Sequence, residues 1–153
     1  MRSRERVISA LRHEATDRPP IDFGGMRSTG IMALAYRKLK AHLGLAEDTL
    51  VYDVIQQLAQ PSEAVLDAFG VDVVDLGRAF LTRPEDWRDW TLPDGSAAKA
   101  PCYFAPESDG AGGWVVRAQD GTVFGRMPKG SQHLTQCCWP LHGLRNAEEI
   151  GEL

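Results

Sequence analysis

The sequence predicts an α/β protein, namely the first strands and helices of a partial (β/α)8 TIM barrel with an inserted antiparallel β-hairpin arm. Residues 18–36 have the pattern of a short buried strand, a glycine turn with polar side chains and a helix. Residues 71–77 form a second β-branched run after a short helix, and this alternation is typical of a parallel sheet. The chain has 153 residues, whereas a closed barrel needs about 250. We therefore expect a single amino-terminal portion of a longer barrel.

Residues 1–86 are expected to hold the helices and the first two barrel strands. Ser3 can cap a short helix whose apolar residues, among them Val7 and Leu11, share one face. A strand follows at residues 21–23. Thr29 then opens a longer helix, because apolar residues recur at helical spacing up to a glycine at position 44 that can end it.

The second half of this region predicts two more helices and a strand. Apolar residues at 54–58 indicate a helix that Pro61 interrupts. Ser62 begins another helix, which Gly70 closes, and the strand at 71–77 comes directly afterwards.

Residues 87–130 predict the hairpin arm, because tryptophans, prolines and turn signals replace the helical pattern. The turn signals lie at 93–95, 109–113 and 120–121. Asp120-Gly121 between two alternating runs predicts a type I′ turn, which needs positive φ at both residues. Residues 131–153 are expected to be a return segment in which Asn146 caps a helix that the end of the chain truncates.

The candidate substrate-binding residues follow the two predicted strands. Chemistry in α/β barrels takes place at the carboxyl ends of the strands. Asp22, Arg27 and Ser28 follow the first strand, and Asp75 and Arg78 follow the second. A guanidinium matches the geometry of a carboxylate, so the two arginines could hold an anion. The alternative is structural, with the aspartates as local caps or ion-pair partners of the arginines.

Composition and charge restrict the classes of partner. The chain is 43% hydrophobic and 25% charged, with a formal net charge of −4 and dispersed basic residues. This argues against a nucleic-acid partner. We expect neither a signal peptide nor a membrane span. Three cysteines cannot all pair within one chain, so a reducing, cytoplasmic location is expected.

The four soft donors near the carboxyl end do not predict a metal site. They are His133, Cys137, Cys138 and His142. Their spacing is no recognised zinc pattern, and adjacent cysteines cannot easily both reach one tetrahedral ion. We therefore predict no metal site within this chain.

Four motifs in order resemble the amino-terminal part of the uroporphyrinogen decarboxylase superfamily. The superfamily contains the decarboxylase and the corrinoid-linked methyltransferases and demethylases. The resemblance covers nearly the whole chain and is carried by residues 4–14 leading into 17–25, by 29–39, by 69–75, and by 140–141 with 147–150.

Two departures favour the methyltransferase branch over the decarboxylase proper. The decarboxylase carries several arginines in the loop after its first strand, whereas Gly24-Gly25-Met26-Arg27-Ser28 contains one. The decarboxylase also carries an aspartate beyond its second strand, where a register that keeps Phe69 and Asp72 in place puts Ala79. The resemblance therefore implies an enzyme that moves a methyl group between a small methylated or methoxylated substrate and a corrinoid protein.

The resemblance also implies cofactors and alternatives. In the full-length family the ligands of a catalytic zinc lie in the carboxyl-terminal half, and the corrinoid is carried by a partner protein. We thus expect no cofactor within this chain, and no catalysis by the isolated chain. The alternatives are the decarboxylase, a tetrapyrrole carboxy-lyase, or a non-catalytic remnant or interaction domain that pairs with a second barrel half.

Overall fold

The computed structural model describes residues 1–139, 141–144 and 150, and these fall into two compact units. The first unit is Met1–Phe104 and the second is Ala105–Leu153. The boundary thus lies inside the segment 87–130 predicted as one arm. The predicted helix after Asn146 lies outside the described residues.

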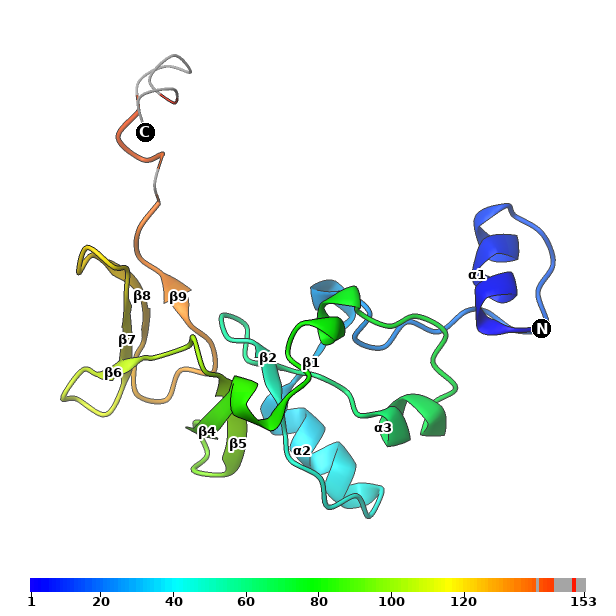
Figure 1. The fold of residues 1–153 in the computed structure, drawn as a ribbon, viewed down its shortest axis with the longest axis horizontal. Coiled ribbons are helices and arrows are strands. Elements are labelled where there is room, and N and C mark those ends of the chain that lie inside the picture. The colour runs from blue at the N-terminus through cyan, green and yellow to red at the C-terminus, as the bar shows by residue number, and fades with distance from the viewer. Residues whose placement is uncertain (140, 145–149, 151–153) are drawn as a thin grey trace. The chain divides into compact units, whose positions relative to one another are not determined.

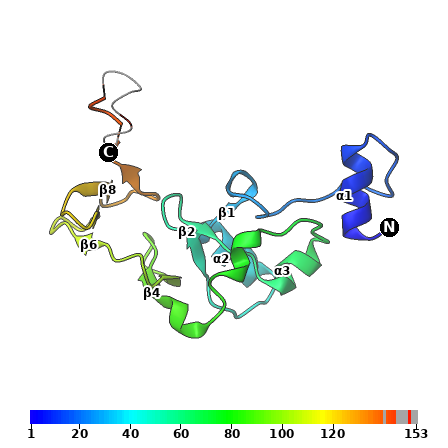
Figure 2. The ribbon, with the colours of Figure 1, turned by 45° about the horizontal axis from the view of Figure 1, so that its top comes forward.

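The first unit combines three helices with two small antiparallel sheets (Figure 1; Figure 2). One sheet has the strand order β1-β3-β2 and the other is the hairpin β4-β5. A parallel bridge between Leu50 and Lys99 connects the hairpin to the segment before β2. The elements are α1 Ser3–Leu11, β1 Ile31–Met32, α2 Ala33–His42, β2 Val51–Asp53, β3 Leu58–Ala59, α3 Glu63–Ala68, β4 Trp87–Thr91 and β5 Ala97–Pro101.

The second unit is a four-stranded antiparallel sheet in the order β6-β7-β8-β9. Val115, Met127 and Leu134 form its buried apolar part. Gly125 lies against Leu134, because a Cβ atom there would approach that side chain to 2.9 Å. The strands are β6 Glu107–Ser108, β7 Trp114–Arg117, β8 Val123–Met127 and β9 Thr135–Gln136.

The fold is therefore mixed α/β, with sheets that are mainly antiparallel, and the described residues form no closed barrel. The two predicted barrel strands are reduced to one parallel bridge between Asp22 and Val73. Next to this bridge the Asp72 amide donates a hydrogen bond to the carbonyl of Ile21 at 2.8 Å. The two segments do lie side by side and parallel, but neither extends into a regular strand.

The helix predicted at residues 54–58 is wrong, because this segment turns between β2 and β3. Asp53 accepts hydrogen bonds from the amides of Ile55 and Gln56, both at 2.9 Å. Gln57 has φ of 55° and its side-chain amide donates to the carbonyl of Val54. Such side-chain bonds to the backbone compete with helix formation.

Both caps predicted for the helices at 3–11 and 29–43 are displaced. Arg2 is the N-cap of α1, and its amide is satisfied by the Glu5 carboxylate at 3.0 Å. The longer helix begins at Ala33, four residues later than Thr29. The reason is pairing with β3, because β1 occupies residues 31–32 before the helix starts.

Other boundaries are confirmed. Gly44 follows α2 with φ of 72°, and Gly70 follows α3 with φ of 59°. Ser62 caps α3 by accepting a hydrogen bond from the amide of Val65.

The hairpin at 114–127 is confirmed, but its type I′ turn is wrong. Gly121 has φ of 86°, whereas Asp120 does not have positive φ. The Ala118 amide donates to the carbonyl of Thr122, and the Gly121 amide donates back to the Ala118 carbonyl. This is a three-residue loop that ends in a left-handed glycine, the common alternative to the two-residue turn.

No described helix has the length and apolar character needed to cross a membrane.

Candidate functional site

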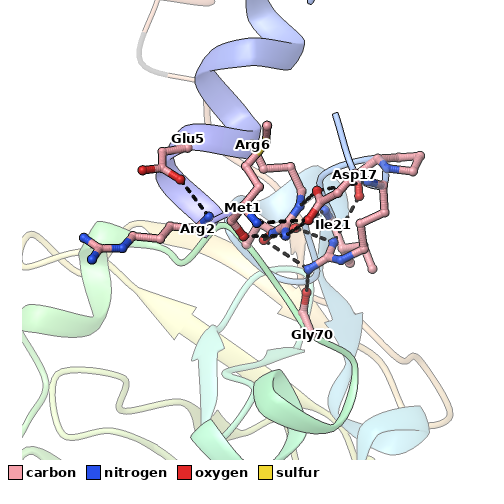
Figure 3. A network of polar contacts seen from close by, with 10 residues as sticks. Met1, Arg2, Glu5, Arg6, Asp17, Ile21 and Gly70 are labelled. Atoms are coloured by element: carbon pink, nitrogen blue, oxygen red, sulfur yellow. Dashed lines mark hydrogen bonds and ion pairs between the residues drawn. The ribbon is translucent and has the colours of Figure 1, made fainter. Parts of the chain in front are cut away.

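Polar side chains gather at both ends of the parallel bridge between Asp22 and Val73. At the amino end they form an ionic network, part of which Figure 3 shows around Arg6 and Asp17. Its centre is Asp72, whose side chain is 0% exposed. Asp72 accepts hydrogen bonds from Arg6, from Arg18 at 2.6 Å and from the Ile21 amide at 2.9 Å. One partner comes from α1 and two come from the segment that follows it.

The arginines of this network have further partners. Arg6 contacts both carboxylate oxygens of Asp17, at 2.7 and 2.8 Å, and also the carbonyl of Met1. Arg18 donates to the carbonyl of Gly70 at 2.8 Å. The side chains of Arg6 and Asp72 are buried and paired, whereas those of Asp17 and Arg18 are partly exposed. The network thus ties α1 to the start of both parallel segments.

The ion pairs of the network lower the pKa values of both of its aspartates. Burial alone would raise the pKa of Asp72, but the hydrogen bonds from Arg18, the Ile21 amide, Ser3 and Arg6 outweigh it and lower the pKa well below its usual range. The pKa of Asp17 is lowered mainly by its hydrogen bonds with Arg6. Both carboxylates are therefore ionised at neutral pH.

At the carboxyl end Asp22 organises the loop that leaves the first segment. Its Oδ1 atom accepts from the Gly25 amide at 2.8 Å and from the Thr29 hydroxyl at 3.0 Å. A Cβ atom on Gly25 would lie 2.6 Å from that oxygen and 2.8 Å from Val73. The position requires glycine because the loop runs this close to the neighbouring segment.

This loop and the residues after Val73 line a pocket of about 450 Å³, here called the exit pocket. Its polar lining side chains are Arg27, Tyr52, Gln60 and Asp75. Its apolar walls include Met26, Phe80, Leu81 and Tyr103. The volume lies within the range of small-molecule sites.

Arg27 is anchored to one wall of the exit pocket. Its Nε atom lies 2.9 Å from Asp53 Oδ2, and this aspartate side chain is only 4% exposed. The Arg27 side chain itself is 70% exposed. One face of the guanidinium is thus neutralised, while its terminal nitrogens have no partner among the described residues.

Tyr52 carries the least satisfied polar atom of the pocket. Its hydroxyl is buried and has no hydrogen-bond partner in the described part of the chain. Burial raises its pKa, and the carboxylates of Asp75, Asp53 and Asp22 add to this effect against the opposing charge of Arg27. The phenol is therefore neutral, and an unpaired buried hydroxyl costs free energy that a polar partner would recover.

Asp75 and Arg78 lie on the 3-10 turn that follows the second segment. Asp75 caps this turn by accepting from the Gly77 amide at 2.8 Å through Oδ1. Arg78 donates to the carbonyl of Pro61 and lines a second, larger pocket of about 840 Å³. Gln60 and Leu81 line both pockets, so the two cavities adjoin.

Only some of the predicted substrate-binding residues lie in a common pocket. Arg27 and Asp75 line the exit pocket, and Arg78 lies in the adjoining one. Asp22 accepts a hydrogen bond from the Gly25 amide and lines neither pocket. Ser28 is exposed and also lines neither pocket. Neither arginine forms an ion pair with Asp22 or Asp75.

Sequence reasoning missed Tyr52 and Gln60. The available signal was the alternation Val51-Tyr52-Asp53, in which the outer two side chains are buried and the middle one faces the other way.

Groups of side chains that could bind a metal ion are also missing from the described part of the chain. Within residues 1–139, 141–144 and 150, no group of three or more histidine, cysteine, aspartate or glutamate side chains is placed to hold one. The described residues therefore offer no donor set for zinc, and the ligands that the resemblance implies belong to the carboxyl-terminal half of the full-length family.

A scan of family models, a search of curated proteins and a search of solved structures each found no match to this chain.

Proposed function

We propose that this chain is the amino-terminal part of a (β/α)8 barrel of the uroporphyrinogen decarboxylase superfamily, in its corrinoid-linked methyltransferase branch. In this proposal the exit pocket holds a small methylated or methoxylated substrate. Methyl transfer would then require a corrinoid protein as partner and zinc ligands from another part of the barrel.

One observation carries the proposal, namely the parallel bridge between Asp22 and Val73 together with the pocket at its carboxyl end. Two parallel segments that each end in a glycine-containing polar loop are the expected beginning of a barrel, whose sites lie at this end. The opposite end holds the saturated network around Asp72, as expected for the face of a barrel that serves stability.

The lining of the exit pocket supports a small substrate over a tetrapyrrole. Arg27 is the one arginine among its lining residues, and Asp53 already neutralises part of its charge. A substrate with several carboxylates would need several cationic partners. A compact molecule with methyl groups matches the apolar walls, which Met26, Phe80 and Leu81 provide.

A binding experiment tests the proposal. The 15N-labelled chain would be titrated with anisole, dimethyl sulfide, tetramethylammonium and uroporphyrin, and amide shifts would be recorded by NMR. We expect at least one methylated compound to shift Gly25, Gly77 and Leu81, with uroporphyrin causing no shift there. Porphyrin binding at these amides would favour the decarboxylase instead, and no binding by any probe would contradict a substrate site in this pocket.

An activity assay complements the titration. The 153-residue chain would be incubated with the same methylated compounds and cob(I)alamin, and methylcobalamin formation would be followed by absorbance. We expect no turnover above the rate without protein, because the described residues supply no metal-activating donor set. Turnover by the chain alone would contradict our proposal that the zinc ligands come from another part of the barrel.

A further inference from the structure

The exit pocket has a feature that its fold does not explain, namely three aromatic side chains in one small cavity. Tyr52 comes from β2, Phe80 ends the 3-10 turn after Asp75, and Tyr103 follows β5. Phe80 and Tyr103 are 77% and 70% exposed. Large apolar rings left exposed around a cavity are typical of a ligand site rather than of a core.

The charges around these rings are mainly negative. Asp75 lines the pocket, and its Oδ2 atom has no hydrogen-bond partner in the described part of the chain. Asp53 and Asp22 also act on Tyr52 with negative charge, and Arg27 acts on it with positive charge. Because Arg27 is paired with Asp53 at 2.9 Å, Asp75 remains as the uncompensated charge of the pocket.

We propose that the exit pocket binds a small methylated ammonium ion, of the size of tetramethylammonium or choline. The methyl groups would lie against Tyr52, Phe80 and Tyr103, and the carboxylate of Asp75 would balance the positive charge. Aromatic faces attract such cations through their negative quadrupole. This inference rests on the proposed function, because it specifies which methylated substrate the same pocket takes.

Two other ligand classes fit the pocket less well. An anion could reach the free nitrogens of Arg27, but it would also face Asp75 across the same cavity. A neutral methylated compound would use the aromatic walls but leave Asp75 without a counter-charge. The methylated cation is the ligand class that uses both features.

Two ligands of the same shape, one charged and one neutral, measure how much the positive charge contributes to binding. Choline and 3,3-dimethylbutan-1-ol have nearly the same shape, but only choline is charged. Titrated against the 15N-labelled chain, choline is expected to shift Gly25, Gly77 and Tyr103 with an affinity at least ten times that of the neutral isostere. Equal affinities would overturn the inference, as would preferential binding of benzoate.

Three variants locate the site. Asp75→Asn keeps an oxygen for the Gly77 amide but removes the charge, and should weaken choline binding at least fivefold without changing the affinity of the isostere. Tyr103→Leu removes an exposed ring and should weaken choline binding at least threefold, whereas Tyr103→Phe should not change it. An unchanged choline affinity in Asp75→Asn would overturn the inference, and the amide spectrum of each variant checks that it folds.

The outcomes separate this inference from the proposed function. If anisole or dimethyl sulfide binds at the exit pocket and choline does not, the methylated-substrate proposal stands and the ammonium inference is wrong. If none of these compounds shifts the pocket amides, both are wrong.

Discussion

The two ends of the parallel bridge between Asp22 and Val73 carry similar residue types but differ in how well those residues are satisfied. At the amino end, whose network Figure 3 shows, the Asp72 side chain is 0% exposed and both of its oxygens have partners. At the carboxyl end Tyr52 has a buried hydroxyl with no described partner, and Asp75 uses one oxygen. Saturated polar groups stabilise a fold, whereas a buried polar group without a partner costs stability.

The largest effect is expected at the amino end. Asp72→Ala leaves Arg6 and Arg18 without their shared carboxylate, so the unit Met1–Phe104 should lose about 3–5 kcal/mol of unfolding free energy. Urea unfolding followed through the amide signals of residues 1–104 measures this. Asp89→Ala is the matched control, because its carboxylate pairs with Lys99 while 96% exposed, and it should cost less than about 1 kcal/mol.

Acid should weaken the same end. The pKa values of Asp72 and Asp17 are lowered in the folded state below the ordinary 3.8. Their contribution is therefore complete above the unfolded pKa and is lost as the pH falls below about 4 towards the folded values. Urea midpoints measured between pH 3 and 7 should drop at the acid end, and Asp72→Asn should flatten that drop. A wild-type midpoint that stays constant down to pH 3 would contradict the network.

A smaller effect is expected from Gly25→Ala at the carboxyl end. The added methyl group would lie 2.6 Å from the Asp22 carboxylate and 2.8 Å from Val73, so the loop must shift. We expect a loss of about 1–3 kcal/mol, together with loss of ligand binding in the exit pocket. Gly143→Ala, which meets open space, is the control and should be neutral in the same unfolding measurement.

The smallest change in unfolding free energy is expected from Tyr52, whose buried hydroxyl has no described partner, compared with Tyr36, whose hydroxyl has one. Tyr52→Phe removes a hydroxyl without a described partner, so its stability should change by less than about 0.5 kcal/mol or rise. Tyr36→Phe removes a buried hydroxyl that accepts from the Ser62 amide at 2.7 Å, and should cost about 1–2 kcal/mol. Equal losses in urea unfolding would show that Tyr52 is as well satisfied as Tyr36.

Local signals in the sequence identified several elements and two of the residues that line the exit pocket. Ser62 precedes α3 as its cap and Gly70 follows its end, and residues 114–127 form the predicted hairpin. Caps, glycines and strand alternation act over only a few residues, so a local pattern is enough to predict them. The positions after the two predicted strands led to Arg27 and Asp75, which line the exit pocket. These features depend on neighbours in the chain, so the sequence by itself determined them.

Tertiary contacts decided the rest. Asp53 favours a turn after β2 locally, through the amides of Ile55 and Gln56. The long-range contact is the hydrogen bond that the Trp90 indole donates to the Gln57 side chain at 2.9 Å, which holds this turn against the β4-β5 hairpin. Tyr52 lines the exit pocket because β2 carries it beside the loop at residues 25–27. Partners this far apart in the sequence leave no periodic signal in either segment, because the free energy of their contact arises only when the chain folds back on itself.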